Sequence, residues 1–274
     1  MAREIYSHSR LSSFESCPKK FEYRYVLKLP SDTEGIEGFM GKRVHEVLER
    51  LYQFTGDGKI PSLGRVLERF RSWWDEHYDA TRVRIVRTEN DADHYRLIGE
   101  HCLTNYYRRF YPFDGDETLG LEERVFFSLD DDEKYRIQGI IDRIVRAPDG
   151  AIEIHDYKTS ARLPNQKQLD RDRQLALYQL GLSKRYGADQ PMRLVWHYLA
   201  PNQTRTSERT PEQLESLRRE TMGLIDRIRV ETRWEAKPGP LCRWCEFNDR
   251  CPAYPDRPAS AEPPPPSRGQ ASLF

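Results

Sequence analysis

The sequence of 274 residues has no long apolar run and no excess of charge of either sign. No apolar stretch approaches the ~20 residues needed to cross a bilayer, and the first residues carry no apolar secretory core. The 44 basic and 44 acidic residues cancel, which argues against indiscriminate polyanion binding but leaves local basic patches open. There is no Gly-x-x-x-x-Gly-Lys-(Ser/Thr) phosphate loop of a helicase motor. We therefore expect a cytoplasmic protein with no membrane partner.

Cysteine is also scarce, and five thiols in a reducing compartment do not indicate a disulfide framework. Their spacing is informative: Cys242 and Cys245 form a Cys-x-x-Cys pair, Cys251 follows closely, and Cys17 lies far upstream. Three ligands in one loop need a fourth from elsewhere. We predict Cys17 for this role, because Cys102 lies in a predicted helix and is expected to be a small core residue. The spacing alone does not separate zinc from an iron–sulfur centre.

The pattern of apolar residues is helical in the first 110 positions and strand-like after them. The predicted helices span residues 12–25, 37–54, 63–77, 92–110, 166–186 and 211–232, and the predicted strands 121–129, 135–146, 151–158 and 193–199. The first helix is expected to begin with a capping box of Ser12 and Glu15. This order predicts an α/β domain over residues 1–254, with a small mixed sheet and an N-terminal helical arm. Residues 255–274 are rich in proline and are expected to be a disordered tail.

The strongest candidate site is a predicted hairpin around Pro148-Asp149-Gly150. If Gly150 is left-handed in a three-residue loop, counting back along both strands places Asp142 opposite Asp156, about 5 Å apart at Cβ. Lys158 shares their face. Two carboxylates this close repel each other unless a cation lies between them, and oxygen ligands suit Mg²⁺ or Mn²⁺. The alternative is a surface hairpin with a weak Asp–Lys ion pair.

Four segments together resemble the RecB-type exonucleases of the PD-(D/E)XK superfamily, in the family's order. They are Gly41-Lys-Arg-Val-His45, Gly139-Ile-Ile-Asp142-Arg143, Asp156-Tyr-Lys158 and Gln174-Leu-Ala-Leu-Tyr178. The resemblance implies the PD-(D/E)XK fold and a metal-dependent deoxyribonuclease that acts on single strands or DNA ends.

The same resemblance implies roles for individual residues. His45, Asp142, Asp156 and the main-chain carbonyl of Tyr157 would hold Mg²⁺ or Mn²⁺. Lys158 would serve the attacking water, and Gln174 and Tyr178 would line the DNA side. Without the resemblance, His45 would be taken for a partly buried histidine. The i, i+4 pair Gln174 and Tyr178 would be taken for ordinary helix surface.

One cysteine before the catalytic segments and three after them resemble the iron–sulfur nucleases of the AddB-type helicase-nuclease and CRISPR-associated exonuclease groups. The resemblance implies a [4Fe–4S] cluster held by Cys17, Cys242, Cys245 and Cys251. Its expected role is structural, because it would close a loop of more than two hundred residues.

The last residues, Gln270-Ala-Ser272-Leu273-Phe274, follow a proline-rich spacer. They resemble the Gln-x-(Ser/Asp)-Leu-Phe motif by which bacterial proteins bind the sliding clamp of the replicase. The resemblance implies that Leu273 and Phe274 fill an apolar pocket and that Gln270 makes polar contacts at its edge. The alternative is a frayed terminus of accidental composition.

The leading hypothesis is an exonuclease of DNA repair or replication, with DNA, the clamp and a helicase in trans as candidate partners. A non-catalytic iron–sulfur DNA-binding module tethered to the clamp is an alternative. So is a CRISPR-adaptation nuclease, against which the clamp-like tail argues. Basic clusters would follow the DNA backbone, and aromatic residues would either stack on bases or belong to the core. The residues in question are Lys42-Arg43, Arg108-Arg109, Arg171, Arg173, Trp73, Trp74, Tyr106 and Tyr107.

Overall fold

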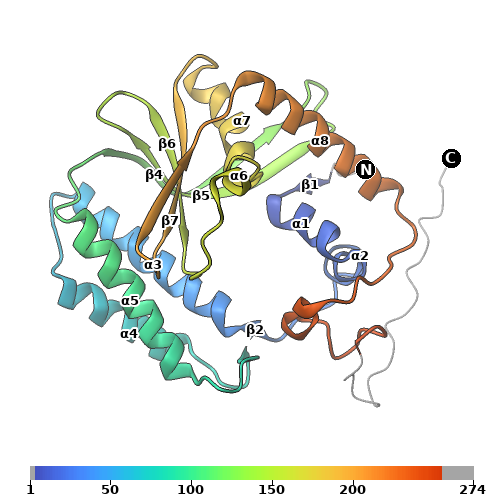
Figure 1. Ribbon diagram of the computed structural model, residues 1–274, viewed down its shortest axis with the longest axis horizontal. Helices are drawn as coiled ribbons and strands as arrows, with labels where there is room; N and C mark the ends of the chain where they lie inside the picture. The colour runs from blue at the N-terminus through green and yellow to red at the C-terminus, as the bar shows by residue number, and fades with distance from the viewer. Residues whose placement is uncertain (1–3, 255–274) are drawn as a thin grey trace.

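The computed structural model describes residues 4–254, and its centre is a mixed six-stranded sheet (Figure 1). The strands are β1 (Ile5–Tyr6), β4 (Glu117–Ser128), β5 (Arg136–Arg146), β6 (Ile152–Lys158), β7 (Met192–Tyr198) and β8 (Gln203–Ser207). They follow the order β1-β5-β6-β7-β8, and β4 pairs with β5. The β6–β7 and β1–β5 pairs are parallel and the others antiparallel. The predicted α/β class with a small mixed sheet is confirmed.

Helices cover both faces of this sheet (Figure 1). They are α1 (His8–Ser16), α2 (Pro18–Phe21) with a π-helical turn (Glu22–Val26), α3 (Ile36–Gly56), α4 (Leu63–His77), α5 (Ala92–Phe110), α6 (Gln166–Leu169), α7 (Gln174–Tyr186) and α8 (Pro211–Val230). The helices α3, α4 and α5 share one core cluster with Tyr157 and Leu199, whereas α7 packs with residues of β5, β6 and β7. A two-stranded pair, β2 (Glu34–Gly35) and β3 (Val83–Arg84), lies apart from the sheet. Within residues 4–254, no helix has the length and apolar character that a membrane span requires.

Two predicted helices are wrong in detail. The first begins at a cap formed by Ser7, whose Oγ accepts from the Arg10 N–H at 3.1 Å, so the predicted capping box of Ser12 and Glu15 does not exist. It also ends at Cys17, because Pro18 starts a new helix as its first residue. The predicted helix over residues 166–186 is two helices, α6 and α7, and the edge strand β8 was not predicted.

The N-terminal helical arm lies beside the last described segment of the chain (Figure 1). Lys20 and Arg24 both form ion pairs with Glu246, at 3.0 and 2.7 Å. The ring of Phe21 stacks on Trp234 with centroids 5.6 Å apart. Segments more than two hundred residues apart in the sequence are therefore packed together, as the cysteine pattern predicts.

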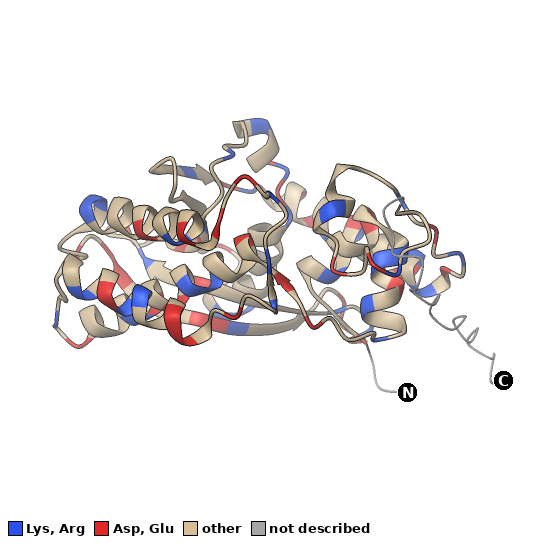
Figure 2. Ribbon diagram, turned by 90° about the horizontal axis from the view of Figure 1, so that it is seen from below, with Lys and Arg blue, Asp and Glu red and all other residues tan. Residues whose placement is uncertain are grey.

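Three of the six basic residues of the predicted tracks are held by contacts within the protein, and Figure 2 shows basic and acidic residues interspersed along the same helices. Arg43 is buried and paired with Glu46, and Arg173 is paired with Glu15. Arg109 donates to a backbone carbonyl, that of Asn202. These three arginines are not free to follow a DNA backbone.

Candidate active site

The predicted hairpin has the expected loop and register. Gly150 is left-handed at φ 87°, and the Ala147 N–H donates to the Ala151 carbonyl at 2.9 Å. The β5–β6 ladder pairs Ile144 with Ile154 and ends at Arg143 and His155. One step further, the Tyr157 N–H donates to Asp142 Oδ2 at 2.7 Å. The Asp142 carboxylate therefore lies where the pairing of β5 and β6 ends, beside the last residues of β6, which include Asp156.

Three side chains meet at this point: His45 from α3, Glu122 from β4 and Asp142 from β5. Their ligand atoms lie within 4.8 Å of one another, and His45 Nδ1 is 3.5 Å from Asp142 Oδ2 and 3.8 Å from Glu122 Oε1. The other ring nitrogen of His45 lies 2.9 Å from the Tyr157 carbonyl oxygen. Burial lowers the pKa of His45, but Asp142 and Glu122 together raise it well above its usual value. One imidazole nitrogen and two carboxylates are a donor set that could hold a divalent cation, while the Tyr157 carbonyl lies at the opposite nitrogen of the ring.

Glu122 was missed by the sequence reasoning. The β4–β5 register pairs Leu121 with Arg143 and Glu123 with Ile141, which places Glu122 level with Asp142. Its backbone is left-handed at φ 42°, a conformation that is uncommon for residues other than glycine. Glu122 could have been found from the register of β4 against β5, but that register depends on the length of the connection between the two strands.

Asp156 lies next to this group but is held by other partners. Its side chain is 4 % exposed, and burial, with a further contribution from Asp142, raises its pKa to about 6 although Lys158 opposes the shift. Oδ1 accepts from Lys158 Nζ and from the Gln174 amide, both at 3.0 Å. Oδ2 lies 2.7 Å from Lys158 Nζ but has no hydrogen-bond partner within the described residues. Asp156 is therefore outside the closest group, with one buried oxygen left for a further ligand.

Lys158 is fixed by the same contacts. Its ammonium donates to Asp156 and to Gln174 Oε1, at 3.0 Å in each case. Burial lowers the pKa of Lys158, but Asp156 outweighs this effect and raises it, so the group stays charged. Gln174 bridges both residues with its amide, and Tyr178 follows one turn later on α7. The structure thus brings Lys158, Gln174 and Tyr178 to one side of Asp156.

A cavity of about 450 Å³ opens beside Gln174 and Tyr178. Its other lining residues are Ser7, His8, Ser9, Arg124, Phe126, Gln138, Gly139 and Ile140. Phe126 and Ile140 are 61 % and 44 % exposed, which is unusual for large apolar side chains. These exposed groups line the same cavity as Gln174, whose amide bridges Asp156 and Lys158.

The aromatic residues named as base-stacking candidates are mostly core. Trp74, Tyr106 and Tyr107 are buried. The Tyr106 hydroxyl lies 2.7 Å from that of Tyr52 and 3.2 Å from that of Tyr157. These contacts join α5 to α3 and to the strand β6, which carries Tyr157. All three are therefore core residues, and Tyr106 also contacts Tyr157, whose carbonyl faces His45.

The four predicted cluster cysteines, Cys17, Cys242, Cys245 and Cys251, line one cavity of about 440 Å³. Backbone N–H groups of Lys237 and Gly239 point at two of the sulfurs, at 3.5 and 3.3 Å. Within residues 4–254, no three of the sulfurs lie within 4.8 Å of one another. Cys102 is fully buried, as predicted. The clamp-binding residues Gln270, Ser272, Leu273 and Phe274 lie outside the described residues.

Comparison with known proteins bears on the family and the fold of the chain. A sequence profile of the PD-(D/E)XK nuclease superfamily matches residues 5–252. A subunit of the ATP-dependent helicase/deoxyribonuclease of Streptococcus uberis is 50 % identical over 146 residues, which cover 51 % of this chain and 13 % of that much longer protein. The crystal structure of a candidate exonuclease from Eubacterium rectale superposes with a TM-score of 0.52 at 15 % identity, over 90 % of this chain and 88 % of the other. At that identity the likeness is one of fold.

Proposed function

The chain belongs to the PD-(D/E)XK nuclease superfamily, and on that premise we propose that it is a divalent-metal-dependent deoxyribonuclease. We further propose that it acts as an exonuclease on single strands or DNA ends, in repair or replication. The observation that carries the proposal is the placement of the His45, Glu122 and Asp142 group beside the Asp156–Lys158 pair.

The residues present fit a divalent cation. His45, Glu122 and Asp142 would hold Mg²⁺ or Mn²⁺, and Asp156, whose buried Oδ2 lies 2.7 Å from Lys158 Nζ, would supply a further oxygen. When bound, such an ion supplies Lewis-acid stabilisation of negative charge on the phosphate.

The chain's own groups prepare the attack. Asp156 and Gln174 hold the Lys158 ammonium in one position, which lets it orient a water molecule or a phosphate oxygen. Because these contacts exist before substrate arrives, little reorganisation is needed during the reaction.

The cavity beside the site suits a DNA strand. Glu122, Arg124 and Phe126 occupy alternate positions of β4, so they follow one another along one face of the strand. We propose that Arg124 binds a backbone phosphate and that Phe126 stacks on a base, since aromatic stacking and basic side chains are how single strands are bound.

We also propose that the four cysteines hold a [4Fe–4S] cluster with a structural role. Tetrahedral zinc would bring its sulfur ligands within about 3.8 Å of one another, whereas no three of these sulfurs lie within 4.8 Å of one another in residues 4–254. The backbone N–H groups that point at Cys17 and Cys242 would stabilise cluster thiolates. Replacing Cys242 by Ala should remove the brown chromophore and lower the melting temperature. A colourless variant with native melting and full activity would count against this role.

Recruitment to DNA is a further part of the proposal. We propose that residues 270–274 bind the bacterial sliding clamp, and that a helicase can supply single strands in trans. A peptide of residues 265–274 should bind a purified bacterial clamp, and the same peptide without Leu273 and Phe274 should not. Failure of the longer peptide to bind even at high micromolar concentration would remove the clamp from the proposal.

Labelled single- and double-stranded DNA provides the test of catalysis. Cleavage should require Mg²⁺ or Mn²⁺, stop with a chelator, and fall at least about a hundredfold in Asp156→Ala and Lys158→Ala. Retained activity in either variant would contradict the assignment. DNA binding without cleavage by the intact protein would instead favour the non-catalytic binding module.

A further inference from the structure

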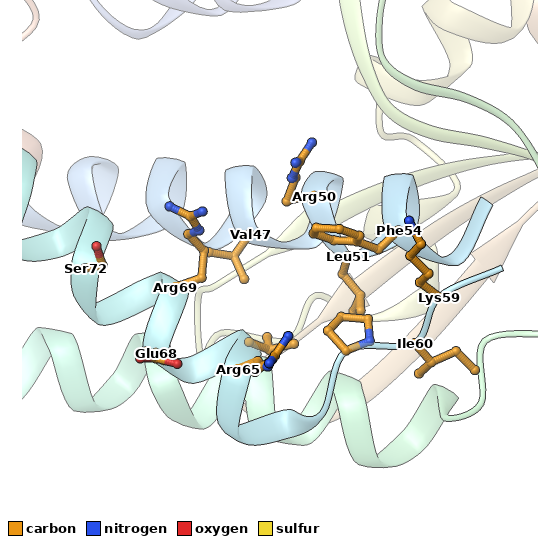
Figure 3. A pocket seen from close by; sticks show the side chains of 12 residues that line it. Val47, Arg50, Leu51, Phe54, Lys59, Ile60, Arg65, Glu68, Arg69 and Ser72 are labelled. Carbon is orange, nitrogen blue, oxygen red and sulfur yellow. The ribbon is translucent and has the colours of Figure 1, made fainter. Parts of the chain in front are cut away.

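A third cavity, of about 640 Å³, lies between α3, α4 and the loop that joins them (Figure 3). Its apolar part is formed by Val47, Leu51, Phe54, Ile60, Pro61 and Val66. Val47, Leu51 and Val66 are buried, so they form a floor, whereas Ile60 is 45 % exposed at the edge. The concave apolar surface is large enough to receive a bulky side chain.

Four cations surround this floor: Arg50, Lys59, Arg65 and Arg69. Glu68 is the one acidic residue of the lining, so the formal charge of the cavity is four minus one, or +3. None of the four cations forms an ion pair within residues 4–254, whereas many other arginines of this neutral chain do. A concentration of unpaired positive charge around an apolar floor complements an acidic ligand that carries an apolar group.

This cavity is separate from the candidate active site. At about 100° per residue along an α-helix, Val47, Leu51 and Phe54 lie about 180–240° around α3 from His45. A ligand bound there would not compete with the metal group, and it would not lie in the cavity beside Gln174 and Tyr178.

We propose that the α3–α4 cavity is a docking site for an acidic peptide segment of a partner protein, with one Leu, Ile or Phe side chain inserted into the floor. Single-stranded DNA fits less well. Phe54 is the one aromatic side chain of the lining, and the Arg50 guanidinium already lies 4.6 Å from its ring centre. A narrow aliphatic floor with a cationic rim accommodates a branched side chain flanked by carboxylates better than a flat base.

Selection of random short peptides displayed on phage against the full-length protein tests this site. The pocket variant carries Arg65→Glu and Arg69→Glu, two exposed residues with no ion-pair partner in the described part of the chain. The matched control carries Arg218→Glu and Arg219→Glu on α8, which changes the charge by the same amount elsewhere. We expect enrichment of Asp- and Glu-rich sequences around one large apolar residue with the wild type and the control, and not with the pocket variant.

A fluorescent peptide made from the enriched sequence then gives dissociation constants. The pocket variant should bind at least about tenfold more weakly, or about 1.4 kcal/mol, and Ile60→Ser should also weaken binding. DNA cleavage should be unchanged in all of these variants, which also shows that they are folded. Enrichment of basic sequences, or equal binding by the pocket variant, would overturn the proposal. The proposal would also be overturned if no peptide is enriched and the pocket variant no longer binds an oligonucleotide, because the cavity would then be a nucleic-acid-binding surface.

Discussion

Replacing Gly139 by Ala tests whether the packing of β5 against α7 sets the geometry of the site. A Cβ at this position would lie 2.8 Å from Tyr178 Cζ and 2.9 Å from Cδ1, and closer still to Cε1. Carbon atoms pack best at about 3.5–4.0 Å, so the ring must move by about 1 Å. Tyr178 is 6 % exposed, so most of its ring is packed against neighbouring side chains, and the cavity beside Gln174 is the space toward which it can shift. We therefore expect a loss of about 1–3 kcal/mol in the free energy of unfolding, as for other overpacked cores.

The same displacement should reach the catalytic groups. Tyr178 lies one turn after Gln174, whose amide bridges Asp156 and Lys158. Misplacement of positioning residues by about 1 Å can reduce a rate by about a hundredfold. We expect Gly139→Ala to lower kcat more than it raises KM, because the change affects the orientation of Lys158 and not the charge of the substrate cavity.

Urea unfolding and cleavage kinetics measure the two effects separately. Gly223→Ala is the matched control, because an added Cβ there meets no atom within 4 Å in the middle of α8. That variant should gain about 0.5–1 kcal/mol of stability and keep full activity. Combining Gly139→Ala with Tyr178→Leu should restore part of the lost stability. If Gly139→Ala is as stable and as active as the wild type, the packing argument fails.

Individual contacts give three further predictions. Glu122→Gln should raise the Mg²⁺ concentration for half-maximal activity by about tenfold or more, and an unchanged metal titration would exclude Glu122 from the site. Asp116→Asn leaves the buried Arg143 guanidinium without its carboxylate partner and should lower the free energy of unfolding, measured with urea, by about 3–5 kcal/mol. Most of that stability should be restored when Asp116→Asn is combined with Arg143→Met. Burial, aided by Arg173, lowers the pKa of His8 to about 4. Below about pH 6.5, His8 is therefore protonated in the unfolded chain but stays neutral in the folded protein, which favours unfolding. At pH 5.5 this should lower the free energy of unfolding of the wild type by about 1.4 kcal/mol, and His8→Gln should not show this loss.

Local patterns predict much of this fold. The helices over residues 63–77 and 92–110 have the bounds expected from their apolar spacing. The β5–β6 register follows from Gly150 and from alternation, because a tight loop fixes which residues face each other. In these three segments a short-range signal determines the structure.

Long-range contacts explain what was missed. Glu122 is one of two adjacent glutamates, and its role depends on a strand register set by the longer connection between β4 and β5. The strand β8, Gln-Thr-Arg-Thr-Ser, has no apolar alternation, because it is an edge strand held by its pairing with β7. The break before α7 is a local exception: the Asp172 side chain accepts from the Gln174 N–H, two residues later, at 2.9 Å.

The packing of the N-terminal arm has a consequence for synthesis on the ribosome. Ile5 pairs with Arg136 on β5, and Phe21 packs on Trp234 near the far end of the described chain. The apolar side chains of residues 5–21 are therefore not fully covered until Trp234, more than two hundred residues later, has been synthesised. A nascent chain that stalls before residue 234 would leave Phe14 and Phe21 accessible to chaperones and proteases.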